Sequence, residues 1–423
     1  MSIRVEIDII PYEKREKINK ELEIKIVPKY GNVQPKYLFP YEIDNDFIKL
    51  PFAYSISELD LKRPSRESLP SRNFSFNATT RPEQKEILKE AKIQLNKTGS
   101  TMISAYTGFG KSISSISLAC SIKFKTLIIV NKIVLIKQWE ESILQFCDNV
   151  TVQKLKPKCK KEDCDFYIIN AQNIEKMGKN FFSDIGAVIV DEAHLIMAES
   201  LSRSLQFVYP RYLIGLTATP YRPDGLNILL DLYFGKHKII RKLHREHIAY
   251  KVTTNFKPTI EYTMSGTINW GIVLDSQAND EDRNELIIKI LQYFKDRNFL
   301  VITKRISQGE YLLQRLEEEK EDVTSLLGSN QEFDKDSRIL VGTSQKVGVG
   351  FDHKRLDALL LAADVEEYFI QYLGRVFRTK EVVPIVVDLV DNYSVLNKHW
   401  ITRRKVYQDC GGTVKNFDLK LIT

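Results

Sequence analysis

The residues that most clearly suggest chemistry lie in a short glycine-containing segment, 105–112, which reads Ala-Tyr-Thr-Gly-Phe-Gly-Lys-Ser. In such a segment the backbone N–H groups can close around the phosphates of a nucleotide, while the lysine reaches the β- and γ-phosphate oxygens and the serine faces Mg²⁺. The segment departs from the pattern G-x-x-x-x-G-K-[ST] at its first position, where Ala105 replaces glycine, but its two glycines still permit the tight turn. The expected phosphate contacts are Thr107, Gly108, Phe109, Gly110, Lys111 and Ser112.

Two adjacent carboxylates, Asp191 and Glu192, stand about eighty residues later in the segment 188–194, Val-Ile-Val-Asp-Glu-Ala-His. The apolar run before them is typical of a parallel strand that is buried on both faces. Because ligands of open α/β sheets bind beyond the carboxyl ends of such strands, we expect these carboxylates to share a site with the lysine and serine. Together the two segments predict that the chain binds a nucleoside triphosphate and cleaves it.

A third set of candidates stands at 371–378, which reads Gln-Tyr-Leu-Gly-Arg-Val-Phe-Arg. On a helix, Gln371, Arg375 and Arg378 fall at i, i+4 and i+7 and therefore share one face. Two guanidinium groups on one face suit the charge that develops on a triphosphate, and an arginine supplied to phosphoryl transfer can contribute about 10³–10⁵ in rate. A solvated basic helix face is the alternative interpretation.

Alternating apolar runs and helical stretches must position these residues. Strands are predicted at 102–105, 126–130, 166–169, 187–190 and 212–216, with helices at 112–122 and 133–146. The pattern restarts with a helix at 280–295, strands at 299–303, 323–327, 338–341, 358–361 and 383–389, and helices at 309–321 and 365–376. Short, continuously apolar strands of this kind belong to parallel sheets covered by helices, so we predict an α/β fold with two such lobes in tandem.

The composition shifts along the chain predict four segments. Residues 1–77 form a small β-rich appendage with strands at 5–9 and 22–27 and a polar linker at 62–77. Residues 78–252 form the first lobe, which binds ATP, and 253–279 connect the lobes. Residues 280–423 form the second lobe and a C-terminal tail.

These segments occur in the order found in superfamily 2 helicases, and the region 81–407 resembles the core of those enzymes, with two RecA-like lobes. The matching segments are 81–84 (Arg-Pro-Glu-Gln), 105–112 (motif I), 131–139 (motif Ia), 191–194 (motif II), 217–220 (Thr-Ala-Thr-Pro, motif III), 342–352 (motif V) and 371–378 (motif VI). The strings 215–225 and 350–357 are similar to one branch of the superfamily. That branch holds the XPB-type DNA repair helicases, phage recombination helicases and the poxviral transcript-release helicase with its relatives in large DNA viruses.

The resemblance implies ATP and Mg²⁺ as cofactors and assigns the hydrolytic roles. Lys111 would neutralise phosphate charge during transfer. Ser112 and Asp191 would hold Mg²⁺, and Glu192 would orient the attacking water as general base.

The resemblance also implies that hydrolysis is coupled to lobe closure. His194 would link the nucleotide site to motif III and to Gln371, while Arg375 and Arg378 would reach across the cleft only when the lobes close. The remaining residues implied to contact the nucleotide, around its adenine and ribose, are Arg81, Gln84, Gly350 and Asp352.

Polar residues after strand ends in both lobes are candidates for binding one nucleic-acid strand, through phosphates and with little sequence preference. These candidates are Asn131, Lys132, Asn170, Gln172, Lys304, Arg305, Thr343, Ser344 and Gln345. Solvated loop residues are an equally weighted alternative.

The composition, 43% hydrophobic and 28% charged, is that of a soluble globular protein. A net charge of +7 permits nucleic-acid binding but does not establish it. Five scattered cysteines indicate a reducing compartment, and no apolar run approaches the ~20 residues of a membrane span. We expect an intracellular protein with no membrane partner or, if it is viral, one in the host cytoplasm that is also packaged in the virion.

The predicted function is that of an ATP-dependent DNA helicase or translocase, with 3′ to 5′ polarity as the branch resemblance implies. The biological process expected for this activity is transcription termination with transcript release, repair or recombination. The expected partner is DNA, tracked as a single strand within a duplex or fork. RNA, an RNA–DNA hybrid, and an RNA polymerase or other transcription or repair factor stay open as partners. The alternatives are an ATP-gated nucleic-acid clamp or remodelling subunit of a transcription complex without unwinding activity, the motor subunit of a restriction-type complex, and an RNA helicase.

Overall fold

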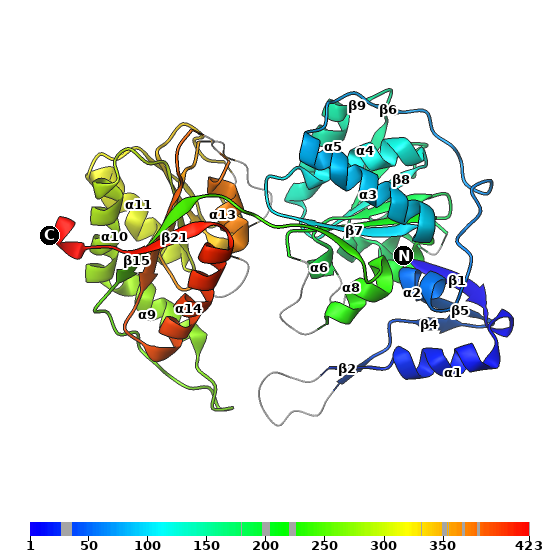
Figure 1. Cartoon of the computed structure of the whole chain (residues 1–423), viewed down its shortest axis with the longest axis horizontal. Helices are drawn as coiled ribbons and strands as arrows, with labels where there is room; N and C mark the ends of the chain where they lie inside the picture. Colours follow the sequence, from blue (N-terminus) through cyan, green and yellow to red (C-terminus); the bar gives the residue numbers. More distant parts are fainter. Residues whose placement is uncertain are drawn as a thin grey trace. The chain divides into compact units, whose positions relative to one another are not determined.

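The computed structural model describes residues 1–423 apart from 27–35, 179, 197–203, 220–225, 331, 349–352, 354, 366–368, 379–380 and 423. The described chain divides into two compact units, Met1–Arg241 and Lys242–Thr423, and each is built on its own parallel sheet with helices against it (Figure 1). In this part of the chain no helix is both long enough and apolar enough to cross a membrane.

The sheet of the first unit has the strand order β10-β11-β8-β12-β13-β7-β14, and neighbouring strands pair in parallel. Its strands are β7 (Ser100–Ala105), β8 (Thr126–Val130), β10 (Val152–Lys154), β11 (Phe166–Asn170), β12 (Ala187–Val190), β13 (Tyr212–Thr217) and β14 (Lys238–Arg241). The helices are α3 (Pro82–Thr98), α4 (Lys111–Ile122), α5 (Val134–Phe146), α6 (Ala193–Ile196) and α8 (Asn227–Phe234). Every residue of β8 and β12 is buried, as their uninterrupted apolar sequences predict.

The N-terminal residues pack onto the first unit instead of forming a separate body. In order they form β1 (Ser2–Glu6), α1 (Tyr12–Glu21), β2 (Ile24–Ile26), β3 (Lys36–Leu38), β4 (Glu42–Asp44), β5 (Phe47–Pro51) and α2 (Phe52–Ser57). The antiparallel order β1-β5-β4, with β2-β3 apart, gives the predicted β-rich character, although the strand expected at 5–9 ends at Glu6. Leu50 and Phe52 are fully buried in the same apolar cluster as Leu229 and Phe234 of α8.

The polar segment 62–77, predicted as a linker, is fastened to the first unit by arginines. Arg63 Nη1 donates to the Leu95 carbonyl at 2.9 Å, and Arg72 Nε donates to Asp165 Oδ1 at 2.7 Å. Arg211 Nη1 donates in turn to the Pro64 carbonyl at 2.5 Å. The segment ends in β6 (Ser75–Phe76), which pairs with β9 (Cys147–Asp148). We call residues 62–77 the strap, because guanidinium groups, with several donors each, hold it at successive points.

The sheet of the second unit has the parallel order β17-β18-β16-β19-β20-β15-β21. Its strands are β15 (His247–Thr253), β16 (Phe299–Thr303), β17 (Val323–Leu326), β18 (Ile339–Thr343), β19 (Ala358–Leu361), β20 (Ile385–Val390) and β21 (Gly412–Asn416). The helices are α9 (Trp270–Asn279), α10 (Glu281–Tyr293), α11 (Ile306–Glu318), α12 (Ser344–Val347), α13 (Ile370–Val376) and α14 (Ser394–Asp409).

The boundary between the units lies earlier than predicted. The prediction places 242–252 in the first lobe, but β15 pairs with β20 and β21 of the second sheet. The expected connection at 253–279 contains α9, whose Gln277 donates to Asp391 Oδ2 at 2.6 Å within the second unit. The error has a physical cause, since β15 is recognised only through partner strands that follow more than a hundred residues later.

A buried network of charges, absent from the predictions, fixes α14 to the second sheet. Arg403 donates to Asp388 Oδ2 at 2.8 Å and to Asp364 Oδ1 at 2.7 Å, and His399 Nδ1 lies 2.6 Å from Asp364 Oδ2. Burial acts to raise the pKa of Asp364, but the hydrogen bond from His399 and the charge of Arg403 outweigh it and lower the pKa. Charges buried this deeply require each other, so the network holds helix and sheet together as one unit.

Candidate functional site

The glycine-containing segment forms a turn between β7 and α4, at the carboxyl edge of the first sheet. Gly108 and Gly110 have φ of +89° and +93°, a region open to glycine, and a Cβ at Gly110 would collide with the side-chain nitrogen of Gln84. Lys111 opens α4, and its Nζ donates to the Ala105 carbonyl at 2.8 Å. The alanine that departs from the pattern therefore contributes its backbone, which any residue could supply.

Arg81 and Gln84 hold this turn from outside. Gln84 is only 3% exposed; its Oε1 accepts from the Arg81 N–H at 2.8 Å and its Nε2 donates to the Phe109 carbonyl at 3.0 Å. The Arg81 guanidinium donates to the Phe109 carbonyl and, at 3.3 Å, to the Gly108 carbonyl. Both residues thus contact the glycine-containing turn directly, in addition to the adenine contact predicted for them.

Asp191 follows directly after β12 and is 9% exposed. Its Oδ2 accepts from Trp139 Nε1 at 2.9 Å, and its Oδ1 accepts from the Glu192 N–H at 3.0 Å. Burial and the charge of Glu192 raise the pKa of Asp191 to about 6, against the opposing effects of the Trp139 hydrogen bond and the charge of Lys111. A carboxylate in these surroundings is stabilised by added positive charge. The Asp191 carboxylate and the Ser112 hydroxyl are both hard-oxygen donors of the kind Mg²⁺ prefers, so the chemistry of these residues fits this cofactor.

Glu192 has a left-handed backbone, with φ of +46°, and its Oε2 lies 3.5 Å from His194 Nδ1. His194 is buried, and its Nδ1 lies 2.8 Å from the Thr217 hydroxyl, which itself donates to the Thr219 carbonyl at 2.7 Å. Because that hydroxyl has one proton, His194 Nδ1 must be the donor to it. A chain of contacts therefore joins motif II to motif III, as the resemblance implies; Pro220, which ends motif III, lies outside the described residues.

Motif VI lies in the second unit, beyond the carboxyl end of β19. Gln371 and Arg375 are buried in α13, and Arg375 Nη2 donates to the Gly348 carbonyl at 3.1 Å. Arg378 lies beyond the last helical residue, Val376, so the predicted helical spacing holds for the first pair but not for Arg378. Burial lowers the pKa of Arg378. The ribose candidates Gly350 and Asp352 lie outside the described residues.

The nucleic-acid candidates of the first unit lie together at the carboxyl edge of its sheet. Asn131 and Lys132 follow β8, and Asn170 ends the adjacent β11 in register with Val130. Asn170 is buried, and its Oδ1 accepts from the Gln172 N–H at 3.0 Å, so it caps the turn; Gln172 is exposed. Their contact with nucleic acid stays a prediction.

The nucleic-acid candidates of the second unit lie at the carboxyl edge of its sheet. Lys304 and Arg305 follow β16, whose last residue pairs with Thr343 of β18, and Ser344 and Gln345 begin α12. Arg305 is already engaged, since its Nε donates to Asp275 Oδ1 at 2.5 Å and its Nη2 to the Gly271 carbonyl at 3.0 Å. A phosphate at Arg305 would have to compete with that carboxylate.

The main residue missing from the predicted site is Trp139, whose indole N–H holds Asp191. The dipeptide Gln138-Trp139 in motif Ia was a signal for it, because a buried tryptophan N–H needs an acceptor and a carboxylate is the strongest one available.

Comparisons with known proteins show which sequences and folds the chain is similar to. The family model described as "Type III restriction enzyme, res subunit" matches residues 77–222. The chain is 42% identical over 446 aligned positions to "Putative helicase 161L" of Invertebrate iridescent virus 6, covering 99% of this chain and 100% of that protein. It is 22% identical to "Transcript termination protein A18" of Yaba-like disease virus, over 90% of this chain and 91% of that protein. The solved structure of S. cerevisiae Dbp5 bound to RNA and ADP BeF3 shares the fold, with a TM-score of 0.58 at 13% identity over 80% of this chain and 93% of that one.

Proposed function

The chain belongs to the superfamily 2 helicases, and from this membership we propose that it hydrolyses ATP with Mg²⁺ to move along DNA as a helicase or translocase. The observation that carries the proposal is the gathering of Lys111, Asp191 and Glu192 at the carboxyl edge of the first sheet, where the charges of Lys111 and Glu192 both act on Asp191. Such a pairing of a phosphate-binding lysine with two strand-end carboxylates is the machinery of phosphoryl transfer.

Each residue then has a distinct part in hydrolysis. Lys111 neutralises the phosphate oxygens in place of the Ala105 carbonyl to which it now donates. Ser112 and Asp191 would hold Mg²⁺, whose charge would supply further neutralisation of the phosphates. Glu192 orients the attacking water and accepts its proton. His194, held by Thr217, lies beside the Glu192 carboxylate and fixes its position.

We assign Arg375 and Arg378 of the second unit the role of stabilising the transferred phosphoryl group. Their support is their place beyond the carboxyl end of β19 and the burial that lowers the pKa of Arg378, since a guanidinium in such surroundings gains from an anion. Supplying them from a separate unit would let movement of that unit govern turnover.

The proposed track is the set of polar residues at the two sheet edges, bound by one DNA strand with 3′ to 5′ movement. The similarity to a poxviral transcript termination protein supports a role in transcript release, with RNA polymerase as a partner. Repair and recombination are the other processes in which such a motor would act.

The test compares ATP turnover with single-stranded DNA, duplex DNA and RNA at one salt concentration, because salt alone changes all three affinities. Stimulation by DNA above RNA, together with displacement of a strand from a 3′-tailed fork, supports the proposal. Turnover that none of the three stimulates contradicts it.

A second candidate is an ATP-gated clamp or remodelling subunit, favoured by the termination role named for the poxviral relative. Such a clamp would show DNA-stimulated turnover and release of a transcript from a stalled polymerase, without displacing a strand from the fork. The two assays on the same preparation separate the alternatives.

A further inference from the structure

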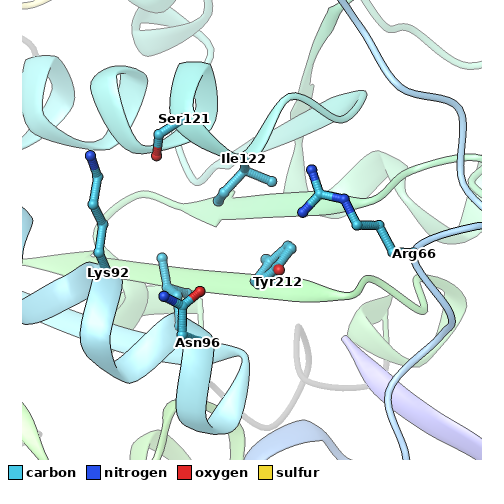
Figure 2. Close-up of a pocket in the computed structure, with 7 residues that line it drawn as sticks. Arg66, Lys92, Asn96, Ser121, Ile122 and Tyr212 are labelled. Carbon is cyan, nitrogen blue, oxygen red and sulfur yellow. The ribbon is translucent and has the colours of Figure 1, made fainter.

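A cavity of about 280 Å³ opens at the amino-terminal edge of the first sheet, opposite the edge that carries the nucleotide site. Its lining residues are Arg66, Lys92, Leu95, Asn96, Ser121, Ile122 and Tyr212 (Figure 2). They come from the strap, the last turns of α3 and α4, and the first residue of β13. Since α4 has 12 residues and begins at Lys111, the cavity lies roughly 18 Å from the phosphate-binding turn at a rise of about 1.5 Å per residue.

Two of the residues that line the cavity, Arg66 and Lys92, are cations, and both are exposed. None of its lining residues carries a carboxylate, and within the described chain neither Arg66 nor Lys92 is in an ion pair. Figure 2 shows Arg66 reaching in from one side and Lys92 standing on the other, with the Ser121 hydroxyl between them. That hydroxyl donates to the Leu118 carbonyl at 2.7 Å, so the donors left for a ligand are the guanidinium, the ammonium and the Asn96 amide.

Two more arginines add to this charge. The guanidinium groups of Arg63 and Arg211 lie 5.4 and 5.7 Å from the centre of the Tyr212 ring. Burial, and after it the charge of Arg211, lower the pKa of Arg63, so these two guanidinium groups lie close enough to repel each other. An anion bound among these cations would reduce the repulsion between them.

The helix ends do not prevent anion binding. The carboxyl ends of α3 and α4 carry partial negative charge that disfavours an anion. Arg63 offsets it at α3, donating to the carbonyls of Leu95 and Asn96 at 2.9 and 3.3 Å. Arg66 and Lys92 each carry a full positive charge, which outweighs the partial negative charges of the helix ends.

We propose that this cavity binds a phosphate group, carried either by a small phosphorylated molecule or by the end of a nucleic-acid strand. Phosphate suits these donors, because its oxygens are strong acceptors for a guanidinium fork, an ammonium group or an amide. The volume falls below the 300–1,000 Å³ usual for sites of drug-sized ligands, so the part of the ligand inside the cavity is no larger than a nucleoside monophosphate. Ile122 and the Tyr212 ring would contact its apolar part.

The test uses the full chain with Lys111→Ala, which removes the main phosphate contact of the nucleotide site. Isothermal titration at low, fixed salt is made with inorganic phosphate, AMP, and a short oligodeoxynucleotide with and without a 5′-phosphate. We expect saturable phosphate binding that weakens about tenfold or more in Arg66→Gln/Lys92→Gln, because two charge-assisted contacts are lost. The matched control Lys62→Gln/Lys89→Gln removes the same charge from the strap and α3, outside the cavity, and should change the affinity less than about twofold.

The other ligands identify the source of the phosphate. AMP binding more tightly than the oligonucleotide indicates a small phosphorylated ligand, and a preference for the 5′-phosphorylated strand over its unphosphorylated twin indicates a strand end. Asn96→Asp puts a carboxylate into the cavity without changing the size of the side chain. This variant should no longer bind AMP or the 5′-phosphorylated strand. No saturable binding in the Lys111→Ala chain, or equal loss in the two double variants, overturns the proposal. Both results leave the ATPase proposal intact, because the nucleotide site lies at the other sheet edge.

Discussion

Asp191 and Glu192 are neighbours in the chain, yet the fold gives them unlike surroundings. Asp191 is held by two donors in a buried position, whereas Glu192 turns through a left-handed backbone toward His194. A fixed, buried carboxylate beside Lys111 is suited to a metal ion. A carboxylate that contacts a histidine is suited to moving a proton. The two acids can therefore be separated by experiment.

Replacing Glu192 by Gln keeps the size of the side chain and removes its basicity. We expect ATP binding to change little and turnover to fall by about 10²–10⁴, the usual contribution of a general base. Fluorescent-nucleotide binding and steady-state ATPase measure the two effects. Substantial turnover in this variant would show that another group activates the water.

Replacing Trp139 by Phe keeps an aromatic ring in the core and deletes the N–H that holds Asp191 Oδ2. Partners that orient a metal ligand typically contribute 10–100-fold to metal affinity, so the Mg²⁺ concentration for half-maximal ATPase should rise by about that factor. Trp400→Phe, in the second unit, is the control and should leave the Mg²⁺ dependence unchanged. A normal Mg²⁺ dependence in Trp139→Phe would argue against Asp191 as the ligand.

At the scale of elements, the attachment of α14 to the second sheet depends on the buried charge of Arg403, which was not predicted from the sequence. Arg403 is 2% exposed and donates to both Asp364 and Asp388. Arg403→Met should lower the free energy of unfolding of the second unit by about 3–5 kcal/mol, because it leaves buried carboxylates without their cation. The exposed neighbour Arg404→Met is the matched control, with an expected change within about 0.5 kcal/mol.

Urea unfolding followed by tryptophan fluorescence measures this loss. Of the three tryptophans, two lie in the second unit, so the Trp139→Phe background reports on that unit alone. Equal unfolding midpoints for the two methionine variants would mean that the network contributes nothing to stability.

The same network makes the second unit sensitive to acid. The pKa of Asp364 is lowered in the folded protein, so its contribution to stability is complete above the unfolded value of about 3.9 and is lost as the pH falls through the folded value. The unfolding midpoint of the wild type should therefore drop more steeply below about pH 4 than that of Asp364→Asn, which has no proton to gain. Parallel decreases in the two proteins would assign the acid sensitivity to other carboxylates.

These elements also show what the sequence can predict. Strands such as 126–130 and 187–190 are predicted correctly, because a strand that is buried on both faces has an uninterrupted apolar sequence. The sequence does not predict the contacts of the strap, the sheet to which β15 belongs or the Arg403 network, because each depends on a partner that is distant in the chain. At the site, short motifs place Lys111 and Asp191, while the hydrogen bond of Trp139 to Asp191 depends on how α5 and β12 pack.

At the scale of the whole molecule, the proposed catalytic residues are divided between the two units. Lys111 and Glu192 belong to the first unit, and Arg375 and Arg378 belong to the second. If turnover needs both sets, ATP binding and ATP cleavage become separable properties of the full chain. Binding would depend on the first unit, and cleavage would depend on how DNA moves the second.

Arg378→Ala in the full chain tests this division. We expect ATP affinity to change less than about threefold and DNA-stimulated turnover to fall by about 10³ or more, because an arginine in phosphoryl transfer acts on the transition state rather than on bound ATP. Arg404→Ala removes an exposed arginine of the same unit and should leave both quantities unchanged. A loss of affinity equal to the loss of turnover would place Arg378 in ground-state binding. Unchanged turnover would mean that the first unit cleaves ATP without it, and a motor driven by closure of the units would then be wrong.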